Sequence, residues 1–106
     1  MRLITEQSTN AFREGQKFNK ANMVIKKENG IVKMYLHKNL IATKDGNKLT
    51  ISNCGWQSNT TKERLNALLY TFGTKEFIFQ KNFEWYMGKD HKTATLWDGR
   101  NKTLSI

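Results

Sequence analysis

Turn dipeptides recur at short intervals along this chain of 106 residues, and proline is absent. Asn29-Gly30, Asp45-Gly46 and Asp98-Gly99 each stand between runs rich in β-branched and aromatic residues. Both residues of such a pair tolerate the positive φ angles of a type I′ turn, the commonest two-residue connection between antiparallel strands. The spacing therefore predicts a chain of short β-hairpins.

The hairpins fall into two groups on either side of one helix. The first group predicts an antiparallel meander of four runs: residues 23–27, 31–36, 40–43 and 48–52. The second group predicts another meander: residues 76–80, 83–87, 92–97 and 103–106. We expect an α+β fold of meander, central amphipathic helix and second meander, with a single layer of helix on sheet. At this length, residues 1–106 are expected to form one domain.

The central helix is expected over residues 60–72. Thr60 and Glu63 have the spacing of a capping box at its start, and Gly73 supplies a stop. One apolar stripe follows the helical period: Leu65, Leu68, Leu69 and Phe72. The polar residues expected to lie away from that stripe are Lys62, Arg64 and Asn66.

A shorter helical segment is indicated near the N-terminus. Ser8 or Thr9 has the chemistry of an N-cap for a turn over residues 10–14, and Gly15 has that of a C-terminal stop.

The charge of the chain is the main guide to its partners. Eighteen Lys and Arg against nine Asp and Glu give a net charge of +9 and a pI near 9.9. Residues 13–48 hold nine basic and three acidic residues, a net charge of +6. Such a field favours polyanions, with solubility as the alternative role. The lysines of this stretch taken as candidate phosphate contacts are Lys26, Lys33, Lys38 and Lys44.

Several classes of protein are disfavoured by what the sequence contains. A single cysteine, Cys54, excludes an internal disulfide, and His37 and His91 stand far apart without the ligands of a zinc site. No phosphate loop, dinucleotide fingerprint or catalytic grouping is readable, so we expect no enzyme, no metal and no cofactor, although catalytic groups distant in sequence could converge. No apolar run approaches the roughly 20 residues of a membrane span, and no signal peptide is visible.

The segment between the first meander and the helix combines several features of a nucleic-acid contact. Trp56 offers a flat surface on which a base could stack, and a helix N-terminus offers free backbone N–H groups and a positive dipole end. Side chains that add donors or charge follow it: Ser58, Thr60, Thr61, Lys62, Arg64 and Asn66. The alternative is structural, with Thr60 only capping the helix and Trp56 filling a gap between helix and sheet.

Three aromatic residues of the second meander, Trp85, Tyr86 and Trp97, allow two interpretations. Alternation along a strand places Trp85 and Tyr86 on opposite faces, so one face is core and the other presents an aromatic ring. The lysines near such a ring are Lys81, Lys89 and Lys92. This arrangement is found in single-strand binders, although most aromatics in small β-domains belong to the core.

The run Gly-Trp-x-Ser-x-Thr-Thr-x-x-Arg-Leu-Asn over residues 55–66, preceded by Leu-His-Lys-Asn-Leu-Ile-Ala over residues 36–42, resembles small uncharacterised proteins of tailed bacteriophages. The resemblance implies a phage origin and a host-cytoplasm setting, but no activity or catalytic residue. It makes these positions the first to test: Gly55, Trp56, Thr60, Thr61, Arg64 and Asn66. Related proteins tend to have glycine after the histidine, where this chain has Lys38.

Two functions follow as hypotheses. The first is a small, basic, non-catalytic protein that binds nucleic acid, either DNA or RNA. The second is an inhibitor or modulator that binds an acidic host protein, such as a polymerase or a defence effector, during host takeover. In either case exposed strand edges leave a homodimer through a sheet edge open.

Overall fold

A computed structural model describes residues 2–106. This part of the chain contains two helices and nine strands: α1 (Leu3–Glu14), β1 (Phe18–Lys20), β2 (Met23–Glu28), β3 (Ile31–Leu36), β4 (Asn39–Asp45), β5 (Lys48–Ile51), α2 (Asn59–Thr71), β6 (Phe77–Lys81), β7 (Glu84–Gly88), β8 (Thr95–Leu96) and β9 (Lys102–Ser105). The expected α+β class with an antiparallel meander is confirmed.

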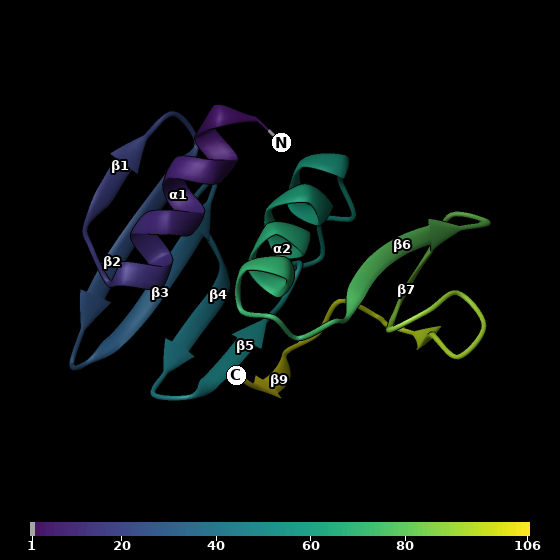
Figure 1. The fold of residues 1–106 in the computed structure, drawn as a ribbon. Helices are drawn as coiled ribbons and strands as arrows, with labels where there is room; N and C mark the ends of the chain where they lie inside the picture. Colours follow the sequence, from purple (N-terminus) through teal and green to yellow (C-terminus); the bar gives the residue numbers. More distant parts are fainter. Residues whose placement is uncertain (1) are drawn as a thin grey trace.

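The strands form two separate antiparallel sheets. The large sheet has the order β1-β2-β3-β4-β5-β9, and the small sheet has the order β6-β7-β8. Both helices lie on the same face of the large sheet, with α1 over β1–β3 and α2 beside β4 (Figure 1). Helix α2 also contacts β6, so it stands between the two sheets. Neither helix among residues 2–106 has the length and hydropathy needed to cross a bilayer.

One hydrophobic core joins the helices to both sheets. A row of paired residues crosses the helix-bearing face of the large sheet, from Ile25 through Met34 and Ala42 to Ile51. All four are buried, and along β3 buried and half-buried residues alternate, whereas in β4 a bulge leaves both Ile41 and Ala42 buried. The small sheet adds Ile78, Trp85 and Met87 to the same core, and Trp97 packs beside Trp85 with ring centroids 6.1 Å apart. Trp85 and Trp97 are therefore core residues.

Helix α1 is longer than the sequence indicates. It begins at Leu3, and its N-cap Arg2 makes no side-chain capping bond, so no capping signal marks its start. Ser8 and Thr9 are not caps but buried helix residues, and the Ser8 hydroxyl donates to the Ile4 carbonyl at 2.8 Å. The stop at Gly15 is confirmed by its left-handed φ of 68°.

The cap of α2 differs from the predicted capping box. Ser58 is the N-cap, and its hydroxyl accepts from the backbone N–H of Thr61 at 3.1 Å. Thr60 lies within the first turn, and the Glu63 carboxylate turns away toward α1, where it accepts from Thr5 at 2.9 Å. The stripe is confirmed, since Leu65, Leu68 and Leu69 are buried and Phe72 packs against the core.

The last strand does not continue the second meander. We expected a hairpin at Asp98-Gly99, but β9 crosses back and pairs with β5, in the register Leu49 to Leu104. In the first meander the Asp45-Gly46 turn is shifted by one residue, because Asp45 pairs with Lys48 inside the ladder. Asn29-Gly30 connects β2 and β3 as predicted, with φ angles of 52° and 81°.

Candidate nucleic-acid interface

A cavity of about 480 Å³ lies between the β3–β4 turn, the β5–α2 loop and the first turn of α2. It is lined by Leu36, His37, Asn39, Ile41, Asn53, Trp56, Ser58, Thr60 and Thr61. Four of these residues, Trp56, Ser58, Thr60 and Thr61, are among the candidates chosen from the sequence. The fold thus gathers the polar and aromatic part of the predicted segment around one hollow.

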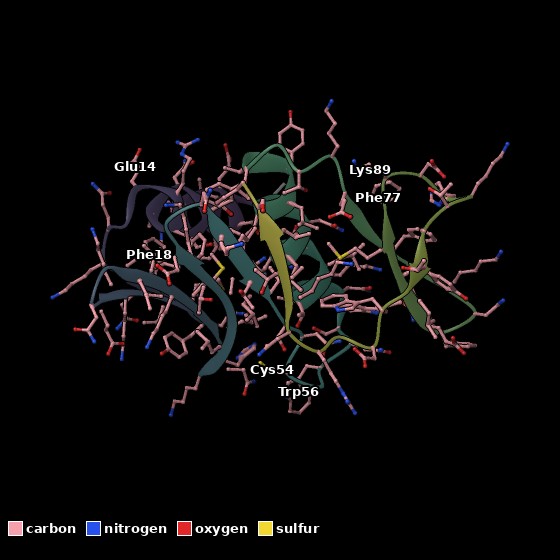
Figure 2. All side chains as sticks on the ribbon, turned by 90° about the horizontal axis from the view of Figure 1, so that it is seen from below. Glu14, Phe18, Cys54, Trp56, Phe77 and Lys89 are labelled. Carbon is pink, nitrogen blue, oxygen red and sulfur yellow. The ribbon has the colours of Figure 1, made fainter. Side chains whose placement is uncertain are left out.

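The β5–α2 loop holds Trp56 at the rim of this cavity. The Asn53 side-chain oxygen accepts from Gly55 N–H at 2.8 Å, and the Asn53 carbonyl accepts from Trp56 N–H at 2.8 Å. Asn53 also donates its backbone N–H to Gly99, where a Cβ would overlap the Asn53 amide. The loop is therefore anchored on the segment before β9. Trp56 is 62% exposed and projects on the side of the molecule opposite Glu14, the last residue of α1 (Figure 2).

The start of α2 supplies backbone donors beside Trp56. The Ser58 side chain satisfies the N–H of Thr61, and the Ser58 carbonyl accepts from Lys62 N–H. Within residues 2–106 the backbone N–H groups of Asn59 and Thr60 have no partner. These two donors stand at the positive end of the helix dipole, which favours an anion.

The β3–β4 turn forms the facing wall. Its two central residues, His37 and Lys38, have φ angles of 49° and 68°, which is the type I′ geometry that normally selects Asn-Gly. The Asn22 amide lies 3.3 Å from the His37 ring nitrogen Nε2. Lys38 stands between two lining residues, His37 and Asn39, and its side chain is exposed. A lysine in the left-handed region costs about 1 kcal/mol relative to an unstrained residue.

The face of the large sheet away from the helices, here called the open face, is covered by no other element of residues 2–106. Lys26 and Lys33 lie opposite each other on β2 and β3. The Lys26 ammonium stands 5.6 Å from the centre of the Tyr35 ring, and Lys33 makes a 3.8 Å ion pair with the exposed Glu28. A second hollow of about 510 Å³ between β1 and β2 is lined in part by Lys17, Lys26 and Lys27.

Two of the other predicted cations lie elsewhere. Lys44 pairs with Val32 and Leu49, so it points to the helix-bearing face at the end of the sheet. Lys62 is half-buried on the first turn of α2 and is not a lining residue of the cavity.

Arg64 corrects the sequence analysis most clearly. It was expected to lie away from the apolar stripe, but its side chain is only 1% exposed. Its guanidinium donates to the Thr5 hydroxyl and to the Glu63 carboxylate, and so ties α2 to α1. Burial lowers the pKa of Arg64, and the Glu63 charge opposes that shift. Arg64 therefore joins the two helices and cannot reach a ligand in the cavity.

Glu63 is the acidic partner in the same cluster. Burial raises the pKa of its carboxyl, but hydrogen bonds from Arg2 and Thr5 and the charges of Arg2 and Arg64 outweigh burial. The pKa of Glu63 therefore lies below its usual value.

Asn66 also has a structural role. Its amide donates to the Ile78 carbonyl at 2.9 Å and its oxygen accepts from the Ile78 N–H at 2.7 Å. These two hydrogen bonds join the backbone of β6 to the Asn66 side chain and so attach the small sheet to α2. Asn66 is thus not part of the cavity.

The lining residues His37, Asn39 and Asn53 were not predicted as site residues. His37 lies in a turn, Asn39 begins β4 and Asn53 lies in the loop after β5, and at none of these places does the local sequence indicate which distant segment will lie beside it. Within residues 2–106, no group of three or more His, Cys, Asp or Glu side chains is placed to hold a metal ion.

Comparison with known proteins places the chain in a family. The family model described as "Kyanoviridae Gp96 protein" matches residues 1–103. The chain belongs to this family. Because the family is a phage family, the predicted phage origin is confirmed, and this phage protein is produced in the infected host cell. No curated protein and no solved structure matches the chain.

Proposed function

We propose that this phage protein is a non-catalytic nucleic-acid-binding protein that acts in the host cytoplasm. The observation that carries the proposal is the open face, which neither helix of the described chain covers and which displays Lys26, Lys33 and Tyr35. Trp56 projects on the side of the molecule away from α1 (Figure 2). Lysines that track a phosphate backbone beside aromatic rings that stack on bases are the two parts of a general nucleic-acid surface.

The cavity beside Trp56 supports the proposal because it combines an aromatic wall with donors for an anion. A phosphate next to a base stacked on Trp56 could accept from the free N–H groups of Asn59 and Thr60, and Lys38 adds positive charge from the turn between the lining residues His37 and Asn39. The remaining walls, Leu36 and Ile41, are apolar.

The backbone at Lys38 supplies a second argument. Glycine is the preferred residue at this position of a type I′ turn, yet the chain carries a lysine with a φ of 68°. Residues held in strained conformations concentrate at functional sites. Lys75 has the same backbone geometry outside the cavity, so what distinguishes Lys38 is its place between two lining residues, His37 and Asn39.

A matched pair of variants tests the proposal. Lys38→Gly and Lys75→Gly each remove one positive charge and each relieve a lysine at positive φ, since Lys75 has a φ of 65° and is exposed in the loop after α2. Both variants are expected to be at least as stable as the wild type. Only Lys38→Gly should weaken binding to fluorescein-labelled DNA and RNA oligonucleotides, measured by anisotropy across a salt series.

The salt dependence gives the quantitative outcome. Losing one phosphate contact should reduce the slope of log affinity against log salt by about 0.7–0.9 in Lys38→Gly and leave it unchanged in Lys75→Gly. If the two variants weaken binding equally, Lys38 contributes only to the overall positive charge of the protein and makes no specific phosphate contact. No binding by the wild type at low salt would overturn the proposal and direct the search to an acidic host protein.

A further inference from the structure

Within residues 2–106 the small sheet has one buried face and one face that no helix or second sheet covers, on which Phe77, Phe79 and Tyr86 are half-buried. Ile78, Trp85 and Met87 point into the core. The alternate residues point the other way and form what we call the outer face: Phe77, Phe79, Lys81, Glu84, Tyr86 and Leu96. Figure 2 shows this sheet, where Phe77 and Lys89 are labelled, at the opposite end of the molecule from Phe18. The outer face is therefore separate from the open face of the large sheet.

Aromatic rings occupy the centre of the outer face. Phe79 and Tyr86 are directly opposite on β6 and β7, with centroids 5.6 Å apart and planes inclined by 15°. Phe77 lies 5.5 Å from Phe79, and His91 extends the group from the β7–β8 loop at 4.5 Å from Phe79. Two or three aromatic rings on neighbouring strands of an uncovered sheet are a general arrangement for stacking unpaired bases.

The charges around the rings favour a polyanion. Lys81 continues the row of Phe77 and Phe79 along β6, and Lys89 and Lys92 stand in the loop that follows β7. Within residues 2–106 none of these three lysines makes an ion pair. Of the nearby acids, Asp90 uses a carboxylate oxygen to accept from Lys92 and Thr93 N–H, and Glu84 stands opposite Lys81.

We propose that the outer face binds single-stranded nucleic acid, with bases stacked on Phe79 and Tyr86 and phosphates beside the three lysines. This inference rests on the proposed function and specifies the kind of strand. A duplex hides the faces of its bases, so the rings select unpaired nucleotides. A second copy of this chain would bring two rims of lysines together, whereas a polyanion neutralises them.

Leucine variants test the inference with little change in apolar volume. Phe79→Leu with Tyr86→Leu should weaken binding of a fluorescein-labelled oligo(dT) or oligo(U) about tenfold or more, because each lost base stack accounts for roughly a 5- to 150-fold change in affinity. Affinity for a duplex of equal length should stay unchanged. Tyr70→Leu is the matched control, since Tyr70 is an exposed aromatic on α2 outside the outer face. Circular dichroism and thermal melting establish that each variant is folded.

Photocrosslinking of the wild type gives a readout that does not depend on variant folding. Trypsin separates residues 76–81, which contain Phe79, from residues 82–89, which contain Tyr86. Ultraviolet crosslinks of oligo(dT) or oligo(U) to these two peptides support the inference. Crosslinks confined to the peptide that carries Trp56 overturn it and leave the proposed function intact.

Two other outcomes separate the proposals. If the double leucine variant binds single strands as the wild type does while Lys38→Gly is impaired, the outer face fails and the cavity stands. If the wild type binds no nucleic acid and self-associates through a contact that the double variant abolishes, both proposals fail and the face is a contact between copies.

Discussion

Replacing Arg64 should lower the free energy of unfolding of the protein without altering any contact to a ligand. Arg64 is buried between α1 and α2 and pairs with Thr5 and Glu63. Arg64→Ala removes both hydrogen bonds and leaves a space between the helices. It also removes a cation from Glu63, whose carboxylate then keeps only Arg2 and Thr5.

The expected cost follows from the exposure of the partner. Removing one member of a fully buried ion pair costs about 3–5 kcal/mol. The Glu63 side chain is 30% exposed and retains Arg2, and Arg64 Nε has no partner, so the cost is expected at about 2–3 kcal/mol. For a domain of this size that lowers Tm by about 10–20 °C. Arg64→Met should cost less than Arg64→Ala, because it keeps an unbranched apolar stem in the space.

Urea titrations followed by circular dichroism measure the free energy of unfolding of wild type, Arg64→Ala and Arg64→Met. Lys62→Ala, on the same helix turn but half-buried, is the control and should change it by less than about 0.5 kcal/mol. An Arg64→Ala protein as stable as the wild type, yet defective in nucleic-acid binding, would refute the reasoning and return Arg64 to the site.

Three further outcomes are expected. The lowered pKa of Glu63 contributes stability that is present above the ordinary carboxyl range and lost as pH falls through the folded-state pKa, so acid should weaken the wild type more than Glu63→Gln in melts across pH 2–6. Asn66→Ala should cost about 1–3 kcal/mol, and hydrogen exchange should rise first in the small sheet, because two bonds to Ile78 are lost; uniform exchange would contradict that role. Phe83→Gly should preserve or raise Tm, since Phe83 is 89% exposed at a φ of 66° after Asn82; a clear loss would mean that its ring packs in solution.

The local part of the fold was predictable from the sequence. The dipeptide Asn29-Gly30 predicts the positive φ angles of its turn, and the apolar stripe from Leu65 to Phe72 predicts which side of α2 is buried. Trp56 with Ser58, Thr60 and Thr61 could be chosen as a site because their chemistry and spacing are contiguous along the chain. Each of these features depends only on residues that are close together in the sequence.

The rest of the fold and of the candidate site depends on contacts between residues that are far apart in the sequence. Nothing near Arg64 reveals that Thr5 will stand beside it, so a charged residue between apolar positions was taken to be exposed. Helix α1 buries small polar residues such as Ser8 where large apolar ones would show the helical period. Likewise, the turn chemistry of Asp98-Gly99 is the same whether the next strand pairs with β8 or with β5.

The return of β9 to β5 has a consequence for how the protein forms as it leaves the ribosome. Strands β1–β5 and α1 emerge in order and can pair with their immediate neighbours. Strand β9, the sixth strand of the large sheet, is synthesised only after α2 and the whole small sheet, and until then β5 has an unpaired edge. The nascent chain therefore passes through a stage in which that edge is open to wrong partners. In the sequence, the small sheet lies between α2 and β9. The ends of the segment that forms it are therefore brought together only when β9 pairs with β5.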